Sequence, residues 1–205
     1  QATTGTFSGN VTVNGTMTAT SFTGIAAGSE YFQANLTTDQ TGLTDESTVV
    51  VDFGGSGTVE YDTSSNFDSS NDAYLLGSSD GVYLISFACG LRSNTLGNTT
   101  GDLISGMAGI EIATDGSTFS GYKAEGQTPR ASDQDSTQSI TVSSSFIYKA
   151  TTATTKIRLT ALCQMTSSDT WNIESTAEGM VQTADTLTSS LKAARVTFMS
   201  VIRTA

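Results

Sequence analysis

The chain has 205 residues and a formal net charge of −11, with 37% hydrophobic and 14% charged residues. This length is sufficient to bury a hydrophobic core in one or two domains without disulfide bonds. The chain contains no histidine, which excludes Ser-His-Asp and Cys-His nucleophiles and any zinc site that needs imidazole. The excess negative charge argues against nucleic-acid binding. The sequence contains no run of about 18 apolar residues, so it predicts no transmembrane helix.

Negative charge is concentrated in the N-terminal part of the chain. No lysine or arginine precedes Arg92, and an acid-rich turn contains Asp62, Asn66, Asp68 and Asp72. Their side-chain oxygen atoms are of the kind that bind calcium. Because their spacing fits no EF-hand loop, capping of turns by these side chains is the alternative. Calcium is the one cofactor that the sequence leaves open.

Catalytic chemistry has little support in this composition. Without histidine, general acid–base catalysis would fall to carboxyl groups with raised pKa values. A glycosidase needs only two carboxylates, but one tryptophan and 8% aromatic residues offer little material for a deep sugar cleft. We therefore predict that the chain has no catalytic residues and is not an enzyme.

Residues 5–20 alternate strictly between two kinds of side chain. Phe7, Val11, Val13 and Met17 share one face, and threonine, serine and asparagine occupy the other. A period of two residues predicts a strand, and a strand of this kind is not stable alone. The run GTFSGNVTVNGTMTATSFTG resembles the N-terminal or shaft motifs of bacteriophage tail-fibre proteins. An edge strand of the main domain is the alternative.

The chain is accordingly divided into two parts. Residues 1–28 are predicted to form a short N-terminal β extension, which serves as a shaft or attachment segment, and residues 29–205 a knob domain. Since the chain begins with Gln1, and an initiator methionine is not normally removed before glutamine, we expect a fragment or a processed product.

The knob domain is predicted to be all-β. Short runs rich in β-branched and aromatic residues are separated by glycine, serine, asparagine and aspartate, which is typical of a sandwich or barrel. The runs cover residues 31–37, 48–53, 57–62, 82–91, 109–114, 140–148, 155–165 and 195–203. A long polar connection is expected over residues 115–139, and a short helical turn over residues 184–194.

Alternation assigns a core face to four of these runs. The predicted core residues are Tyr83, Ile85, Phe87, Cys89 and Leu91; Ile140, Val142, Phe146 and Tyr148; Ile157, Leu159, Ala161, Cys163 and Met165; and Val196, Phe198 and Ile202. The opposite faces are also apolar at Val82, Leu84 and Ala88, and at Met199 and Val201. A sheet that is apolar on both sides needs cover on both sides, which favours an oligomer.

Three single residues complete the sequence-based predictions. Cys89 and Cys163 lie on core faces, so we expect both to be buried and reduced, with a single disulfide as the alternative. Trp171 lies in the polar run 166–172. An exposed aromatic ring suits stacking on a sugar, so Trp171 is the one candidate ligand-binding residue. Its alternative role is to anchor a loop on the sandwich.

The run VVVDFGGSGTVEYDTSSNFDSSNDAYLLGSSDGVYLISFACGL, residues 49–91, resembles the complement globular-head and tumour-necrosis-factor-like jelly-roll family. The matching elements are Val51 and Phe53, Tyr61-Asp62, Asn66-Phe67, and Gly81-Val82-Tyr83 with Phe87. The turn at residues 150–155 lacks the family's Gly-Asp pair, and the closing strand lacks its Phe-x-Gly-Phe ending.

The resemblance implies a jelly-roll β-sandwich of about ten antiparallel strands that forms a compact homotrimer. It further implies that the inner sheets face a three-fold axis, that the two cysteine-bearing strands pair side by side, and that the protein binds rather than catalyses. We therefore predict a structural virion protein on the surface of the extracellular particle, as a trimeric tail-fibre or fibre-tip module.

In this interpretation the knob attaches to a host-surface glycan or protein, and the N-terminal segment joins other virion proteins. Two alternatives stay open because the sequence does not encode the assembly context. One is a capsid decoration or head-fibre protein that stabilises the shell. The other is a secreted, non-viral globular-head binding protein.

Overall fold

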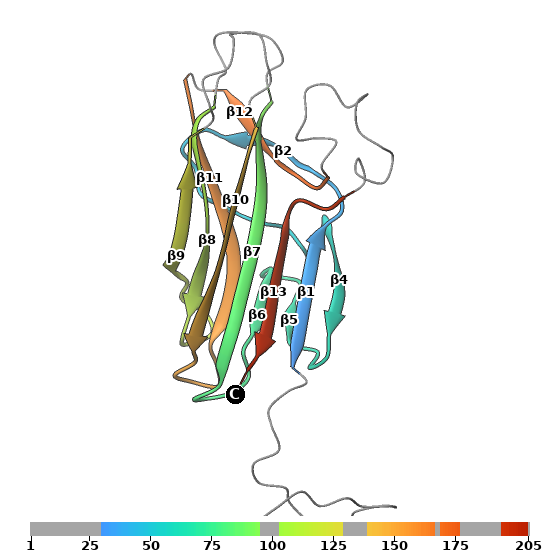
Figure 1. The fold of residues 1–205 in the computed structure, drawn as a ribbon, viewed down its shortest axis with the longest axis vertical. Coiled ribbons are helices and arrows are strands. Elements are labelled where there is room, and N and C mark those ends of the chain that lie inside the picture. Colours follow the sequence, from blue (N-terminus) through green and yellow to red (C-terminus); the bar gives the residue numbers. More distant parts are fainter. Residues whose placement is uncertain (1–29, 95–102, 129–138, 167–168, 177–193, 205) are drawn as a thin grey trace, which may run out of the picture.

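The computed structural model describes residues 30–94, 103–128, 139–166, 169–176 and 194–204. All of the regular secondary structure in these ranges is β-strand (Figure 1), and no helix in them could cross a membrane. The extension 1–28 and nearly all of the expected helical turn lie outside the described residues. The strands are β1 (Tyr31–Leu36), β2 (Gln40–Thr44), β3 (Val49–Val50), β4 (Gly57–Asp62), β5 (Phe67–Asp68), β6 (Ala73–Leu75), β7 (Val82–Ser93), β8 (Leu103–Ala113), β9 (Ser120–Gln127), β10 (Ser139–Lys149), β11 (Lys156–Met165), β12 (Thr170–Glu174) and β13 (Phe198–Arg203).

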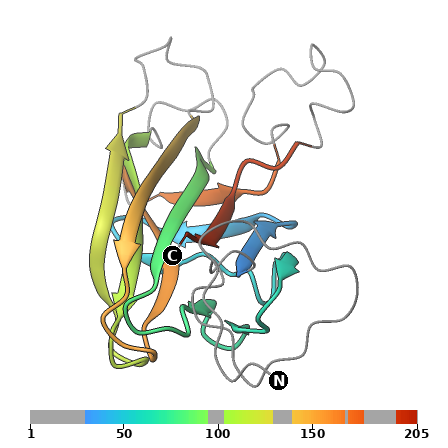
Figure 2. The same cartoon turned by 60° about the horizontal axis from the view of Figure 1, so that its bottom comes forward.

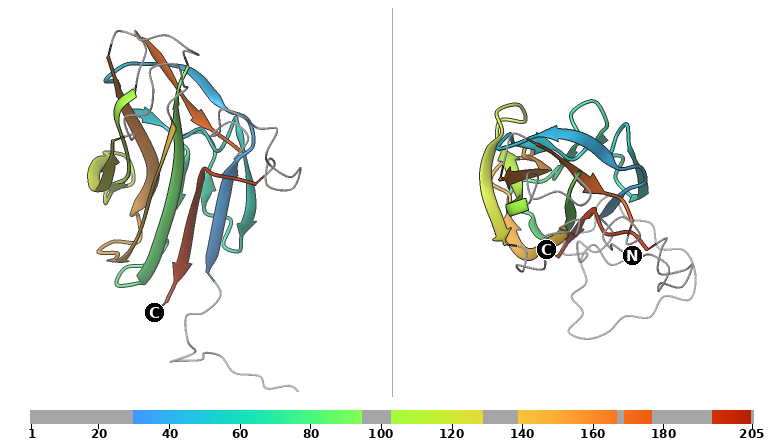
Figure 3. Two further views of the ribbon diagram at one scale, coloured as in Figure 1. Left: turned by 45° about the horizontal axis from the view of Figure 1, so that its top comes forward. Right: turned by 90° about the horizontal axis from the view of Figure 1, so that it is seen from above.

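These strands form two antiparallel sheets. The seven-stranded sheet has the order β2-β12-β7-β13-β1-β4, and β10 pairs with β7. The six-stranded sheet has the order β5-β6-β11-β8-β9, and β3 pairs with β11. The two sheets form the layers of a sandwich, seen from below in Figure 2 and from above in Figure 3.

The pairing of eight strands is nested. β1 pairs with β13, β6 with β11, β7 with β10, and β8 with β9. In chain order, the first of these eight strands pairs with the last, the second with the seventh, and so on inward. This winding is that of a jelly roll, in which closure of two sheets leaves few exposed edges. The predicted fold class, an all-β jelly-roll sandwich, is confirmed.

The core faces predicted for three strands are also confirmed. Along β7, β10 and β11 the predicted residues point between the sheets, and nearly all are fully buried. The core face predicted for the last strand, β13, was wrong. Met199 and Val201 are buried, whereas Phe198 and Ile202 face outward. Both faces of β13 are apolar, so alternation alone could not choose between them.

Two segments that were expected to be connections, because their sequences are polar, contain strands. Residues 115–139 include β9, which pairs along β8 although most of its side chains are exposed. Residues 166–172 include the start of β12, which lies between β2 and β7. Strand β9 is held by backbone hydrogen bonds, which require no apolar pattern in the sequence.

Both cysteines are buried and free, as predicted. The implied side-by-side pairing of their strands is wrong, since Cys89 lies on β7 and Cys163 on β11, in opposite sheets. Burial raises the pKa of the Cys89 thiol to about 12 and raises the pKa of Cys163 as well. Because the thiolate is the reactive form, both side chains act as small apolar core residues at neutral pH.

Candidate functional site

Trp171 is fully buried, so the expectation of an exposed ring in a loop is wrong. The residue lies on β12, opposite Leu43 of β2 and Ser93 of β7. Its indole Nε1–H donates a hydrogen bond to the Thr44 carbonyl oxygen at 2.9 Å. The ring is an anchor that packs inside the sandwich, and it offers no surface for stacking on a sugar.

The acid-rich turn consists of carboxylates that have separate partners. The Asp62 carboxylate accepts hydrogen bonds from two backbone N–H groups, four and five residues further along the chain. Asp68 forms an ion pair with Lys156 at 3.0 Å, and Asp72 accepts a hydrogen bond from the Gly54 backbone N–H at 2.6 Å. Within the described ranges, no group of three or more acidic or cysteine side chains is placed to hold a metal ion.

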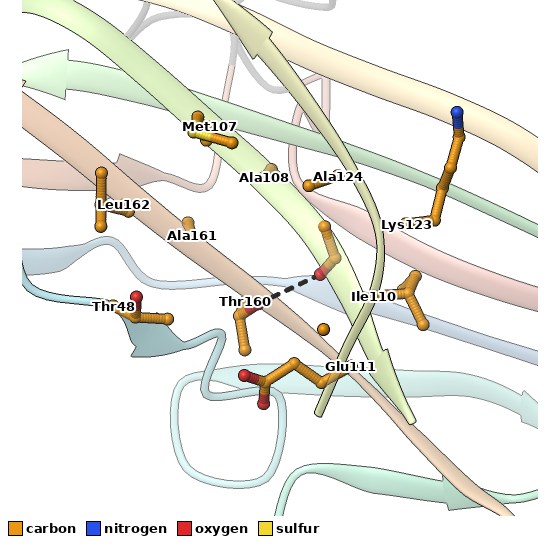
Figure 4. A pocket seen from close by; sticks show the side chains of 12 residues that line it. Thr48, Met107, Ala108, Ile110, Glu111, Lys123, Ala124, Thr160, Ala161 and Leu162 are labelled. Atoms are coloured by element: carbon orange, nitrogen blue, oxygen red, sulfur yellow. Dashed lines mark hydrogen bonds between the residues drawn. The ribbon is translucent and has the colours of Figure 1, made fainter. Parts of the chain in front are cut away.

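A groove of about 200 Å³ lies on the outer face of the six-stranded sheet. Figure 4 shows β9 crossing over β8 beside it, with Met107 and Leu162 at one end. A Cβ atom at Gly109 would lie 2.5 Å from the Lys123 carbonyl oxygen, so the close approach of β9 to β8 requires glycine.

Polar groups around this groove are engaged within the chain. Glu111 binds Arg158 at 2.7 Å, and Lys123 binds Glu125 at 2.8 Å. The Thr160 hydroxyl donates to the Gly109 carbonyl oxygen at 3.3 Å. This leaves a small, largely apolar floor that can receive an apolar group but offers little for specific polar recognition.

A second surface is formed by the outward-facing side chains of β10, β7, β13 and β1, which we call the central face. Strand register aligns them in three rows that cross the four strands. The rows are Ile147, Leu84, Ile202 and Tyr31; Ser145, Ser86, Ser200 and Gln33; and Ser143, Ala88, Phe198 and Asn35.

The central face contains no charged residue. Ile147 and Ile202 are 69% and 40% exposed, while the serine row is neutral and the Ser145 hydroxyl donates to that of Ser86 at 2.8 Å. Charged residues return beyond the three rows, at Lys149, at Arg92 and at Glu60 of β4, which accepts a hydrogen bond from the Gln33 amide at 3.4 Å. The exposed apolar part of this uncharged face is the row of Ile147, Leu84, Ile202 and Tyr31, because Ala88 and Asn35 of the third row are only 8% and 4% exposed.

The outer face of the six-stranded sheet has the opposite character. Arg158 pairs with Glu111 across β11 and β8, and the Arg158 guanidinium lies 4.1 Å from the centre of the Phe119 ring. Lys156, also on β11, forms a second ion pair with Asp68 at 3.0 Å. Ion pairs in contact with water are normal on a solvated surface and contribute little to stability. Of these two outer faces of the described sandwich, the central face therefore has the composition of a contact surface.

An aromatic pair lies at the β4 side of the central face. Tyr31 on β1 and Tyr61 on β4 have ring centroids 5.2 Å apart, and Tyr61 is 53% exposed. Exposed aromatic groups of this kind are enriched at protein interfaces.

Only part of this surface is predictable from the sequence. Val82, Leu84 and Ala88 are predicted as a second apolar face, and the last two lie in the rows of the central face. Ile147 was not predicted there, and Phe198 and Ile202 were assigned to the core. The available signal was the lack of charge at alternating positions of four runs, but only the strand order shows that these positions adjoin.

No protein-family model and no curated protein matches the chain. Among solved structures, it is similar to Eiger TNF from S. frugiperda, with 9% identity, 86% of this chain and 92% of that chain covered, and a TM-score of 0.45. It is also similar to murine APRIL at pH 5.0 and pH 8.0, with 7% and 6% identity, 84% and 97% coverage of the two chains, and TM-scores of 0.47 and 0.48. The jelly-roll assignment itself follows from the nested strand pairing of this chain.

Proposed function

We propose that the chain is a non-catalytic structural and binding module that works as a homotrimer, with the central face of each subunit packed against the other two. The observation that carries this proposal is the absence of charge in three adjoining rows of side chains. Interface cores are depleted in charged residues, and a contiguous exposed apolar patch marks a site of association. The count of three subunits is supported by the sequence resemblance of residues 49–91.

Light scattering tests this proposal directly. We expect a particle of about three times the chain mass of 21.2 kDa at micromolar concentration, because removal of water from the apolar row lowers the free energy of the assembly. A monomer under these conditions would contradict the proposed assembly, and a dimer would contradict the three-fold arrangement.

For the wider context, we propose a tail-fibre or fibre-tip module of a virus particle that attaches to a host-surface glycan or protein. Support comes from the alternating segment at residues 5–20 and its likeness to fibre shaft motifs. The eight nested strands all lie between Tyr31 and Arg203, which supports a knob that forms without that segment. In this proposal, residues 1–28 join the knob to other virion proteins.

Deleting residues 1–28 is expected to leave the knob folded and trimeric but unable to join its particle. Circular dichroism and light scattering of the shortened chain report the fold and the assembly, and antibody labelling of particles reports attachment. If the shortened chain does not fold, the segment is part of the sandwich. Label on the shell of whole particles would favour the capsid decoration alternative, and a protein found on no particle would favour the secreted one.

A further inference from the structure

Glu174, the last residue of β12, is a buried carboxylate. Its side chain is 0% exposed, and Oε1 lies 2.6 Å from Nε of Arg92 on β7. No hydrogen bond of good geometry reaches either of its oxygen atoms. Buried polar atoms without hydrogen bonds are rare in folded proteins, because each forfeits its hydration without replacement. This carboxylate therefore needs a physical account.

A second carboxyl group lies beside it. Asp39, from the connection between β1 and β2, is within hydrogen-bonding reach of the Glu174 side chain. Its Oδ1 accepts hydrogen bonds from both the backbone N–H and the hydroxyl of Ser175, each at 2.7 Å. The chain segment that follows β1 is thus tied to the end of β12 at this point.

The charges at this site do not balance. Arg92 is the close cation, whereas Arg195, from the segment before β13, donates to the Thr37 carbonyl oxygen at 3.4 Å. Strand β2 contributes no ionisable side chain here, since it reads QTGLT. Two carboxylates facing one guanidinium leave an excess negative charge beside the fully buried Glu174 side chain, which is costly although Asp39 itself is only partly buried. One proton removes that excess.

We propose that the buried Glu174 side chain binds a proton and donates it in a hydrogen bond to the Asp39 carboxylate, which fastens the end of β12 to the connection after β1. The proton comes from solvent. Glu174 then donates its O–H to the Asp39 carboxylate, which keeps its hydrogen bonds from Ser175, while the other Glu174 oxygen stays beside Arg92. The buried oxygen atoms acquire partners, and the site becomes neutral overall.

The electrostatics of Glu174 agree with this arrangement. Burial raises its pKa above the ordinary carboxyl value, Arg92 and the nearby Asn172 side chain oppose the rise, and Asp39 adds to it. A carboxyl group with a raised folded-state pKa binds its proton more tightly in the folded chain than in the unfolded chain. Stability is then gained as the pH falls through the folded-state pKa, and lost as the pH rises through it.

The test compares thermal unfolding of Glu174→Gln with that of the natural chain between about pH 7.5 and pH 5, at a fixed protein concentration. Glutamine imitates the protonated acid at every pH, because its N–H can donate to Asp39 and its oxygen can face Arg92. We expect the melting temperature of the variant to be higher than that of the natural chain at pH 7.5. A fivefold increase in the folding equilibrium constant corresponds to a rise of about 2–4 °C. The difference is expected to shrink as the pH falls, since only the natural chain takes up the proton.

Two controls isolate this effect. Burial also raises the pKa values of Glu30 and Asp72, so only the difference between variant and natural chain is informative. Asp39→Asn should reduce the pH dependence as Glu174→Gln does. Glu111→Gln, in a second arginine–glutamate pair, should not. Equal pH dependence in the natural chain and in both site variants would overturn the proposal. So would a Glu174→Gln variant that is destabilised equally at every pH, which would leave Glu174 as a simple partner of Arg92.

Discussion

Replacing Ile202 by glutamate is expected to convert the proposed trimer into monomers, whereas replacing Ile104 by glutamate is not. The two isoleucines form a matched pair, because they are 40% and 43% exposed and both lie on strands. Ile202 lies in the middle of the apolar row of the central face, beside Leu84 and Tyr31. Ile104 lies on β8, in the sheet whose outer face carries ion pairs.

The physical reason is the cost of removing a carboxylate from water. In a trimer, each of three glutamates would be buried against uncharged neighbours, without a cation within the three rows to pair with. Leaving a charge buried and unpaired costs about 3–5 kcal/mol, which corresponds to at least a hundredfold weaker association. On a solvated face the same substitution changes stability by about 0.5 kcal/mol or less.

Light scattering across a concentration series separates the outcomes, and circular dichroism shows whether each variant is folded. Equal assembly of the Ile202→Glu and Ile104→Glu variants would show that the central face is not the contact surface. Loss of assembly in the Ile104 variant alone would move the interface to the six-stranded sheet.

The second large effect is expected from Trp171→Ala, which should lower the free energy of unfolding by about 3–5 kcal/mol. The indole ring is fully buried between β2 and β7, and the truncated side chain would leave a cavity there. Trp171→Phe keeps most of the apolar ring but loses the hydrogen bond to the Thr44 carbonyl oxygen. We therefore expect Trp171→Phe to lower the free energy of unfolding by about 1–3 kcal/mol, because the Thr44 carbonyl oxygen loses its partner.

Urea unfolding followed by circular dichroism measures both variants, with the half-exposed Ile104→Ala as the control. The expected order of destabilisation is Trp171→Ala first, Trp171→Phe second and Ile104→Ala last. A Trp171→Ala variant no less stable than the control would indicate that the ring does not pack in the core. That outcome would restore the carbohydrate-binding interpretation of this residue.

The sequence by itself determined the fold class and three of the core faces. Strands β7 and β11 alternate between large apolar residues and other residues over their whole lengths, so burial of one face follows from the cost of exposing it. Cys89 and Cys163 lie within those patterns, and their burial followed with them. The low content of charge in the runs that became the central face was also present in the sequence.

Tertiary structure decided what local patterns left ambiguous. Both faces of β13 are apolar, and only its pairing between β1 and β7 shows that Met199 points inward and Ile202 outward. Trp171 has polar neighbours on both sides, and strand β2 buries it from more than 120 residues away. Pairings such as Tyr31 with Ile202 depend on which apolar faces can be covered together, which is a property of the whole sandwich. The three uncharged rows exist as one surface only because this long-range pairing places four separate strands side by side.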